Sequence, residues 1–106
     1  MNKRESIIQQ IVQVADKNYP ESEVYPYGSR ARKKVNTNSD WDLLILLKED
    51  NVPFELETGV MDNYYDLELK IGEVFSPLVY AKSDWNDNYS IIPRYDNIQK
   101  EGVKLK

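Results

Sequence analysis

The chain has 106 residues, of which 41% are hydrophobic and 30% are charged. This length fits one domain over residues 1–106, and the composition excludes an intrinsically disordered chain. Cysteine and histidine are absent, which excludes disulfides, thiolate chemistry and the usual zinc sites. Any catalysis must therefore use carboxylates, hydroxyls, backbone amides or cationic side chains. The net charge of -4 argues against direct, non-specific binding of nucleic acid.

No apolar run approaches the roughly 20 residues that a membrane helix needs. The first ten residues, MNKRESIIQQ, are polar and lack the apolar stretch of a signal peptide. We therefore expect no membrane contact and a cytoplasmic location.

The first half of the chain predicts a helix followed by two strands. Apolar residues recur at helical spacing, which predicts an amphipathic helix over about residues 2–18. Residues 24–27 predict a short extended segment that stops at Gly28. Residues 29–39 favour a helical turn and then a polar loop. The stretch WDLLILL, residues 41–47, predicts a strand whose apolar end is typical of burial on both faces.

The second half predicts a long helix, a strand and short helical pieces. A helix is expected over about residues 54–71, with Pro53 in its first position and Gly72 as its terminator. Residues 74–80 predict a strand in which Pro77 requires an edge position or a bulge.

The tail continues this alternation of helices and strands. Ser83-Asp84-Trp85 predicts a helix cap, and residues 93–102 predict a short amphipathic helix. Together the elements indicate an α/β or α+β fold, a small mixed β-sheet flanked by helices.

Gly28 and Ser29 lie where the first predicted strand turns into a helical segment. Glycine lets the backbone approach a ligand closely or take a positive φ angle. The amides that follow and the Ser29 hydroxyl suit phosphate oxygens. Arg32 lies three residues later on the same helical face, so its guanidinium could reach the same phosphates. Taken alone, a Gly-Ser pair marks many turns, and the cations at 30–34 are more often an exposed helix face.

Asp40 and Asp42 stand at the entrance to the predicted strand 41–47. Because side chains alternate along a strand, both aspartates point to one face and Trp41 to the other. Two carboxylates about 7 Å apart repel each other unless a cation lies between them. Mg²⁺ held by one or two carboxylates and substrate phosphates is usual in phosphoryl transfer. A solvated strand start remains the alternative for the pair alone, but its combination with the glycine turn and basic face favours nucleotide chemistry.

This arrangement resembles a known family. Gly28-Ser29, ten intervening residues and Asp40-x-Asp42 are similar to the signature of the DNA polymerase beta-like nucleotidyltransferases. The stretch GSRARK…SDWDLLIL, residues 28–46, resembles the minimal nucleotidyltransferases in particular. The resemblance implies a nucleotidyltransferase-like fold. The site residues it implies are Gly28, Ser29, Arg32 and Ser39 for the nucleotide, and Asp40 and Asp42 for catalysis and for binding two magnesium ions.

The resemblance also implies a function. Several minimal nucleotidyltransferases are antitoxins that transfer AMP from ATP to a tyrosine of a HEPN-domain toxin, an all-helical protein. By this resemblance the chain is a magnesium-dependent transferase with ATP as substrate and a HEPN-domain protein as partner.

The chain departs from the family pattern at two positions. Lys33 stands where a glycine is frequent, and Ser76 stands where active members usually carry a third carboxylate. Serine cannot replace an anion as a metal ligand or base, and we expect Asp66 and Glu68 to lie on a solvated helix face. Two alternatives therefore stay open: an active transferase, or a catalytically impaired module that binds and neutralises its partner without transfer.

Overall fold

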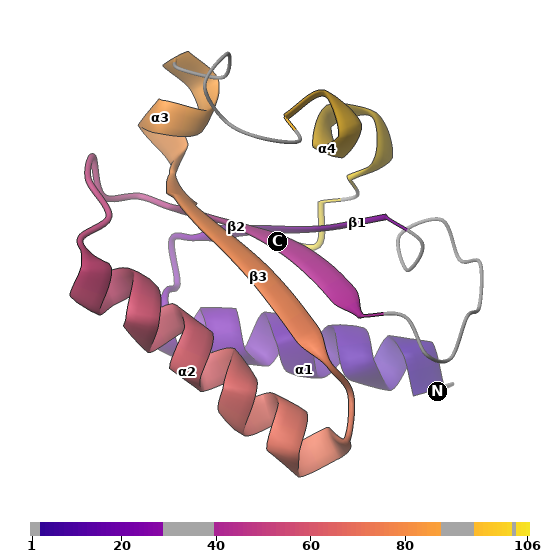
Figure 1. Ribbon diagram of the computed structural model, residues 1–106. Coiled ribbons are helices and arrows are strands. Elements are labelled where there is room, and N and C mark those ends of the chain that lie inside the picture. Colours follow the sequence, from indigo (N-terminus) through magenta and orange to yellow (C-terminus); the bar gives the residue numbers. More distant parts are fainter. Residues whose placement is uncertain (1–2, 29–39, 88–94, 103) are drawn as a thin grey trace.

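The computed structural model describes residues 3–28, 40–87, 95–102 and 104–106 (Figure 1). In chain order its elements are α1 (Lys3–Asn18), β1 (Glu23–Tyr27), β2 (Trp41–Leu47), α2 (Phe54–Ile71), β3 (Phe75–Ala81), α3 (Lys82–Asp87) and α4 (Tyr95–Glu101). Of the helices in these ranges, none has the length and apolarity to cross a membrane.

The three described strands form a mixed sheet in the order β1-β2-β3. β1 runs antiparallel to β2, and β3 runs parallel to it. The central place of β2 explains its unbroken apolar run, because Leu43 to Leu47 are all buried. Pro77 lies in β3, an edge strand of this sheet, as its missing N–H requires. The predicted mixed sheet flanked by helices is confirmed.

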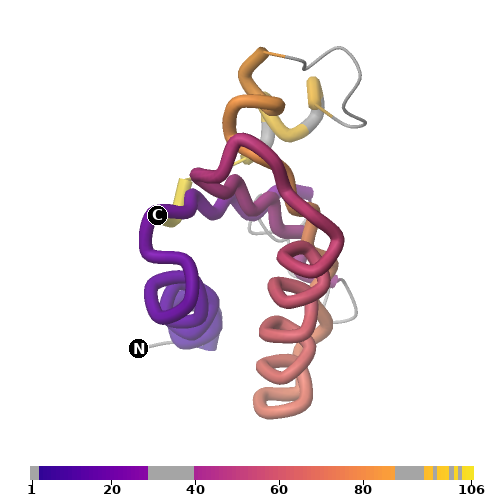
Figure 2. The backbone as a smooth tube through the Cα atoms, turned by 90° about the vertical axis from the view of Figure 1, so that its left-hand side faces the viewer, coloured from indigo at the N-terminus to yellow at the C-terminus, as the bar shows by residue number. Residues whose placement is uncertain are grey.

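Helices cover both faces of the sheet, as Figure 2 shows. α1 and α2 lie side by side on one face, and α3 and α4 lie on the other. The first face holds the larger core, in which side chains from both helices meet alternate residues of β2 such as Leu43 and Ile45. Leu44 and Leu46 point the other way and pack with Trp85 of α3. Successive residues of β2 therefore serve two separate cores.

The C-terminal residues are tied to β1. The Leu105 amide donates to the Val24 carbonyl at 2.9 Å, and Leu105 packs against the larger core. Lys106 Nζ lies 2.6 Å from Asp16 Oδ1 and donates to the Pro20 carbonyl. These contacts hold the end of the chain against the first third of the fold.

Element boundaries follow local chemistry. Gly72 ends α2 in the left-handed region (φ 76°) and donates its N–H to the Glu68 carbonyl, as predicted. Pro53 is the residue before α2, not its first helical residue. The prediction for Ser83 and Asp84 is also wrong, because α3 begins at Lys82 and places both inside its first turn.

Candidate active site

The four described residues of the candidate site come from three adjacent strand ends. Asp42 in β2 pairs with Tyr27 of β1 on one side and with Ser76 of β3 on the other. Gly28 directly follows β1, and Asp40 directly precedes β2. We call Gly28, Asp40, Asp42 and Ser76 the catalytic edge. The strand pairing thus brings together residues that are up to 48 positions apart in the sequence.

Asp40 and Asp42 lie on the same side of the sheet as α3 and α4. Trp41 between them is 1% exposed and packs into the larger core on the opposite side. Asp42 shares the direction of Leu44 and Leu46, which face α3 and α4. Asp42 is half-buried and Asp40 is exposed. The packing of Trp41 on one side of β2 and of Leu44 and Leu46 on the other agrees with the alternation expected along this strand.

Trp41 anchors the strand start on which the carboxylates stand. Its indole Nε1 donates to Glu73 Oε1 at 3.3 Å, and the Arg4 guanidinium lies 5.6 Å from the ring centre. Its backbone amide donates to the Val74 carbonyl at 2.8 Å. Because the Trp41 indole is buried and its backbone amide is hydrogen-bonded, the start of β2 cannot readily twist. The neighbouring residues Asp40 and Asp42 are therefore held in place.

Gly28 has a backbone conformation that few other residues adopt. Its φ angle is 73°, in the left-handed region. A β-carbon placed there would lie 3.0 Å from Asp42 Oδ2. Glycine therefore lets the backbone directly after β1 lie close to the Asp42 carboxylate.

Ser76 contacts the carboxylate pair directly. Its hydroxyl Oγ donates to Asp40 Oδ2 at 3.2 Å. Ser76 thus lies beside Asp42 in the sheet and orients Asp40 by a hydrogen bond without adding charge.

Asp66 and Glu68 do not supply the missing carboxylate, because α2 covers the opposite face of the sheet. Asp66 is exposed, as predicted. The prediction for Glu68 is wrong: its side chain is half-buried, and its Oε1 accepts the Phe75 amide at 3.0 Å. The Glu68 carboxylate thus provides a hydrogen-bond acceptor for the backbone N–H at the start of β3.

The remaining site predictions, Ser29, Arg32 and Ser39, fall outside the described residues, as does Lys33. Within the described ranges no three acidic, histidine or cysteine side chains gather into a metal-binding cluster. The donors present are two carboxylates and a hydroxyl. That set fits Mg²⁺, a hard cation that completes its shell with water and substrate phosphates.

The sequence reasoning missed a charged group farther along the same face. Glu23 of β1 accepts the Tyr25 hydroxyl and forms ion pairs with Lys82 of α3 and Lys104. Burial alone would raise the pKa of Glu23, but the hydrogen bonds from Lys82 and Tyr25 outweigh it and hold that pKa below its ordinary value. Burial and the bond to Glu23 raise the pKa of Tyr25 to about 12.

Glu23, Tyr25 and Lys82 line a cavity of about 270 Å³ between the sheet and α3 and α4, which Trp85 also lines. In the sequence, this cluster could have been inferred only from the alternation of side chains along a strand, which places Glu23, Tyr25 and Tyr27 on one face of β1.

A mixed sheet carrying two carboxylates beside a glycine turn defines a nucleotidyltransferase-type domain. A model of the family "Polymerase beta, Nucleotidyltransferase" matches residues 9–100, and the chain belongs to this family. The resemblance to the DNA polymerase beta-like nucleotidyltransferases is thereby confirmed. No curated protein sequence matches the chain.

Solved structures confirm the fold. The chain is similar to one protein in a toxin–antitoxin crystal structure with AMP-PNP, with a TM-score of 0.67 and 15% identity over 93% of this chain and 72% of the other. Two mutants of the toxin–antitoxin pair MntA–HpeT also match. The double aspartate-to-glutamate mutant has a TM-score of 0.64 and 13% identity, covering 93% and 71% of the two chains. The tyrosine-to-alanine mutant has a TM-score of 0.64 and 14% identity, covering 92% and 70%.

Proposed function

We propose that this domain is a magnesium-dependent nucleotidyltransferase that transfers a nucleoside monophosphate, AMP from ATP, to a hydroxyl of a protein partner. The observation that carries the proposal is the close approach of Asp42 to Gly28, where a β-carbon would lie only 3.0 Å from Asp42 Oδ2. Asp40 lies directly before the strand that carries Asp42. Family membership and the AMP-PNP bound in a structure of similar fold support the assignment.

Each residue of the catalytic edge has a distinct part in this proposal. Asp40 and Asp42 would hold Mg²⁺, and when bound the metal supplies positive charge against the triphosphate. Gly28 keeps the turn close enough for backbone amides to meet phosphate oxygens. Ser76 orients Asp40 through its hydrogen bond. The packed Trp41 keeps the two carboxylates on one face.

The chemical step is an in-line displacement. The acceptor oxygen forms a bond to the α-phosphorus, while the bond between that phosphorus and the bridging oxygen of pyrophosphate breaks. The acceptor proton leaves to solvent, since the Ser76 hydroxyl is not a base at neutral pH. The chain contributes position and charge complementarity, which are the main sources of rate in phosphoryl transfer.

The acceptor we propose is a tyrosine hydroxyl of a HEPN-domain toxin, with this chain as the antitoxin in the cytoplasm. The proposal is supported by the toxin–antitoxin assemblies in which the similar folds were solved. A domain of this size has little surface to enclose an acceptor as well as a nucleotide, so a partner would complete the site.

The test is transfer of label from [α-³²P]ATP with Mg²⁺ to the protein encoded beside this chain. We expect the partner to gain label and a mass increase of one AMP, and the Asp40→Asn/Asp42→Asn variant to transfer none. A partner that stays unlabelled by active, folded protein would contradict the enzymatic proposal.

Ser76 gives a second candidate function specific support, because a hydroxyl stands where a third carboxylate is usual. Under this alternative the domain neutralises a toxin by binding alone. The Asp40→Asn/Asp42→Asn variant would then still protect cells that express the toxin. Under the enzymatic proposal that variant fails to protect them.

A further inference from the structure

The exposed large apolar side chains of the described residues all lie on α2 or directly after it. Phe54 is 80% exposed, Tyr65 is 56% exposed and Leu69 is 67% exposed, and Met61 is also exposed. These four are spaced seven, four and four residues apart, so they form one continuous line along the helix. We call them the outer stripe.

Neither hydrophobic core of the described residues includes the outer stripe. α2 packs on the sheet and α1 through the opposite side, where Val60, Tyr64 and Leu67 are buried. A helix that serves only its own core needs one apolar side and a polar remainder. A second apolar line of four large side chains is the mark of an interaction surface.

Acidic residues border the outer stripe. Helical spacing places Glu55, Asp62 and Asp66 along one flank and Glu57 along the other. The three on the first flank are exposed. Lys70, the nearest cation on α2, lies farther round the helix.

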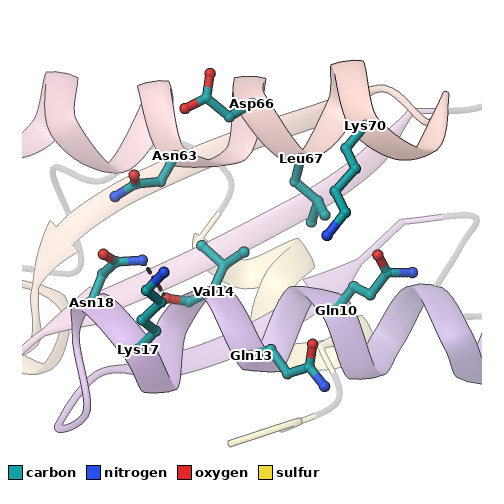
Figure 3. Close-up of a pocket in the computed structure, with 9 residues that line it drawn as sticks. All are labelled: Gln10, Gln13, Val14, Lys17, Asn18, Asn63, Asp66, Leu67 and Lys70. Atoms are coloured by element: carbon teal, nitrogen blue, oxygen red, sulfur yellow. Dashed lines mark hydrogen bonds between the residues drawn. The ribbon is translucent and has the colours of Figure 1, made fainter.

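The groove between α1 and α2 explains the position of Lys70. Figure 3 shows the Lys70 side chain directed toward α1 and the Asp66 carboxylate directed away from it. Both residues belong to a cavity of about 400 Å³ between the two helices, which Gln10 and Asn63 also line. Lys70 is therefore directed away from the flank formed by Glu55, Asp62 and Asp66, and that flank keeps its negative charge.

We propose that the outer stripe docks a cationic amphipathic helix of a partner protein. Such a helix would lay apolar side chains against the stripe and its Lys or Arg side chains against the acidic flanks. A second copy of this chain is disfavoured, because two acidic borders would face each other. Anionic lipid is disfavoured for the same reason.

The outer stripe leads to the catalytic edge. Beyond Leu69 the chain passes through Gly72 and Val74, whose carbonyl accepts the Trp41 amide between the two aspartates. Figure 1 shows the end of α2 beside the start of β3. A helix docked along the stripe would end beside the start of β3, on the face of the sheet opposite to Asp40. Any role in presenting an acceptor rests on the proposed function, whereas the docking itself does not.

The test uses a fluorescent synthetic helix of 18 residues, the length of α2, made of Leu and Lys in amphipathic order. Anisotropy would measure its affinity for wild type and for Glu55→Gln/Asp62→Asn/Asp66→Asn. The matched control is Glu49→Gln/Asp50→Asn/Asp96→Asn, which removes the same charge at exposed positions outside α2. We expect the first variant to bind at least about tenfold more weakly and the control to stay within about twofold of wild type.

The apolar contribution is tested with Tyr65→Ser/Leu69→Ser, which is expected to weaken the same peptide by about tenfold or more. Equal weakening in both charge variants, or equally tight binding of a Leu/Glu peptide, would overturn the proposal. So would a dimer that Leu69→Ser abolishes, or binding to phosphatidylcholine vesicles through the stripe.

The Asp40→Asn/Asp42→Asn variant should bind the peptide as wild type does. Measurement of transfer therefore tests the proposed enzymatic function, and measurement of peptide binding separately tests the proposed docking surface.

Discussion

A β-carbon at Gly28 is disfavoured for two independent reasons, one in its own backbone and one in its neighbour. The positive φ strains any other residue, and a β-carbon would lie 3.0 Å from Asp42 Oδ2, which would have to shift. The sequence alone pointed to this glycine because it ends a predicted strand. It could not reveal that the contact is with Asp42, since the pairing of β1 with β2 is a tertiary property.

Gly28→Ala is expected to lower the free energy of unfolding by about 1–3 kcal/mol and to reduce nucleotide affinity, because Asp42 must move. The control is Gly59→Ala in the middle of α2, where a β-carbon meets nothing closer than the Tyr19 hydroxyl at 4.0 Å. That change should raise stability by about 0.5–1 kcal/mol. Thermal unfolding measures both, and a Gly28→Ala variant as stable as wild type would contradict the strain argument.

Ser76→Asp should make the protein more dependent on metal. A third carboxylate beside Asp40 and Asp42 adds repulsion in the absence of a cation and adds a ligand in its presence. We expect Mg²⁺ to raise the melting temperature of this variant more than that of wild type. Ser83→Asp, in the first turn of α3, is the control. Equal responses to Mg²⁺ would show that Ser76 does not face the metal site.

At the scale of elements, the sequence predicted β2 and α2 with their observed bounds. The unbroken apolar run of β2 is a local signal, and so are the proline before α2 and the glycine after it. The boundary of α3 and the role of Glu68 were not predictable, since they depend on how the two ends of β3 meet their neighbours. The cluster of Glu23, Lys82 and Lys104 was missed for the same reason, because its members are up to 81 positions apart.

Glu23 joins β1, α3 and the C-terminal segment, so its ionisation affects their stability together. Because its folded pKa lies below the ordinary value, its contribution is fully present above about pH 4.3 and is lost as pH falls through the folded pKa. Glu23→Gln should cost about 1 kcal/mol at neutral pH.

Chemical denaturation from pH 3 to pH 7 measures this effect, and the loss of stability on acidification should be smaller in Glu23→Gln than in wild type. Glu49→Gln, at an exposed position, is the control. Identical pH profiles for wild type and Glu23→Gln would contradict the assignment.

At the scale of the whole molecule, one sheet separates two tasks. The face under α1 and α2 supplies most of the core, and the face under α3 and α4 carries the carboxylates. Sequence periodicity predicted this division at β2, where apolar residues continue on both faces but aspartates stand only at the entrance. It could not place Ser76 beside them, because strand order is not encoded locally.

The most direct test is the affinity for AMP-PNP in the presence of Mg²⁺, measured by calorimetry on wild type and on Asp40→Asn/Asp42→Asn. We expect wild type to bind and the variant, folded with an unchanged circular dichroism spectrum, to lose at least about tenfold in affinity. Equal affinity in the two proteins would contradict the claim that this pair of carboxylates holds the metal and the triphosphate.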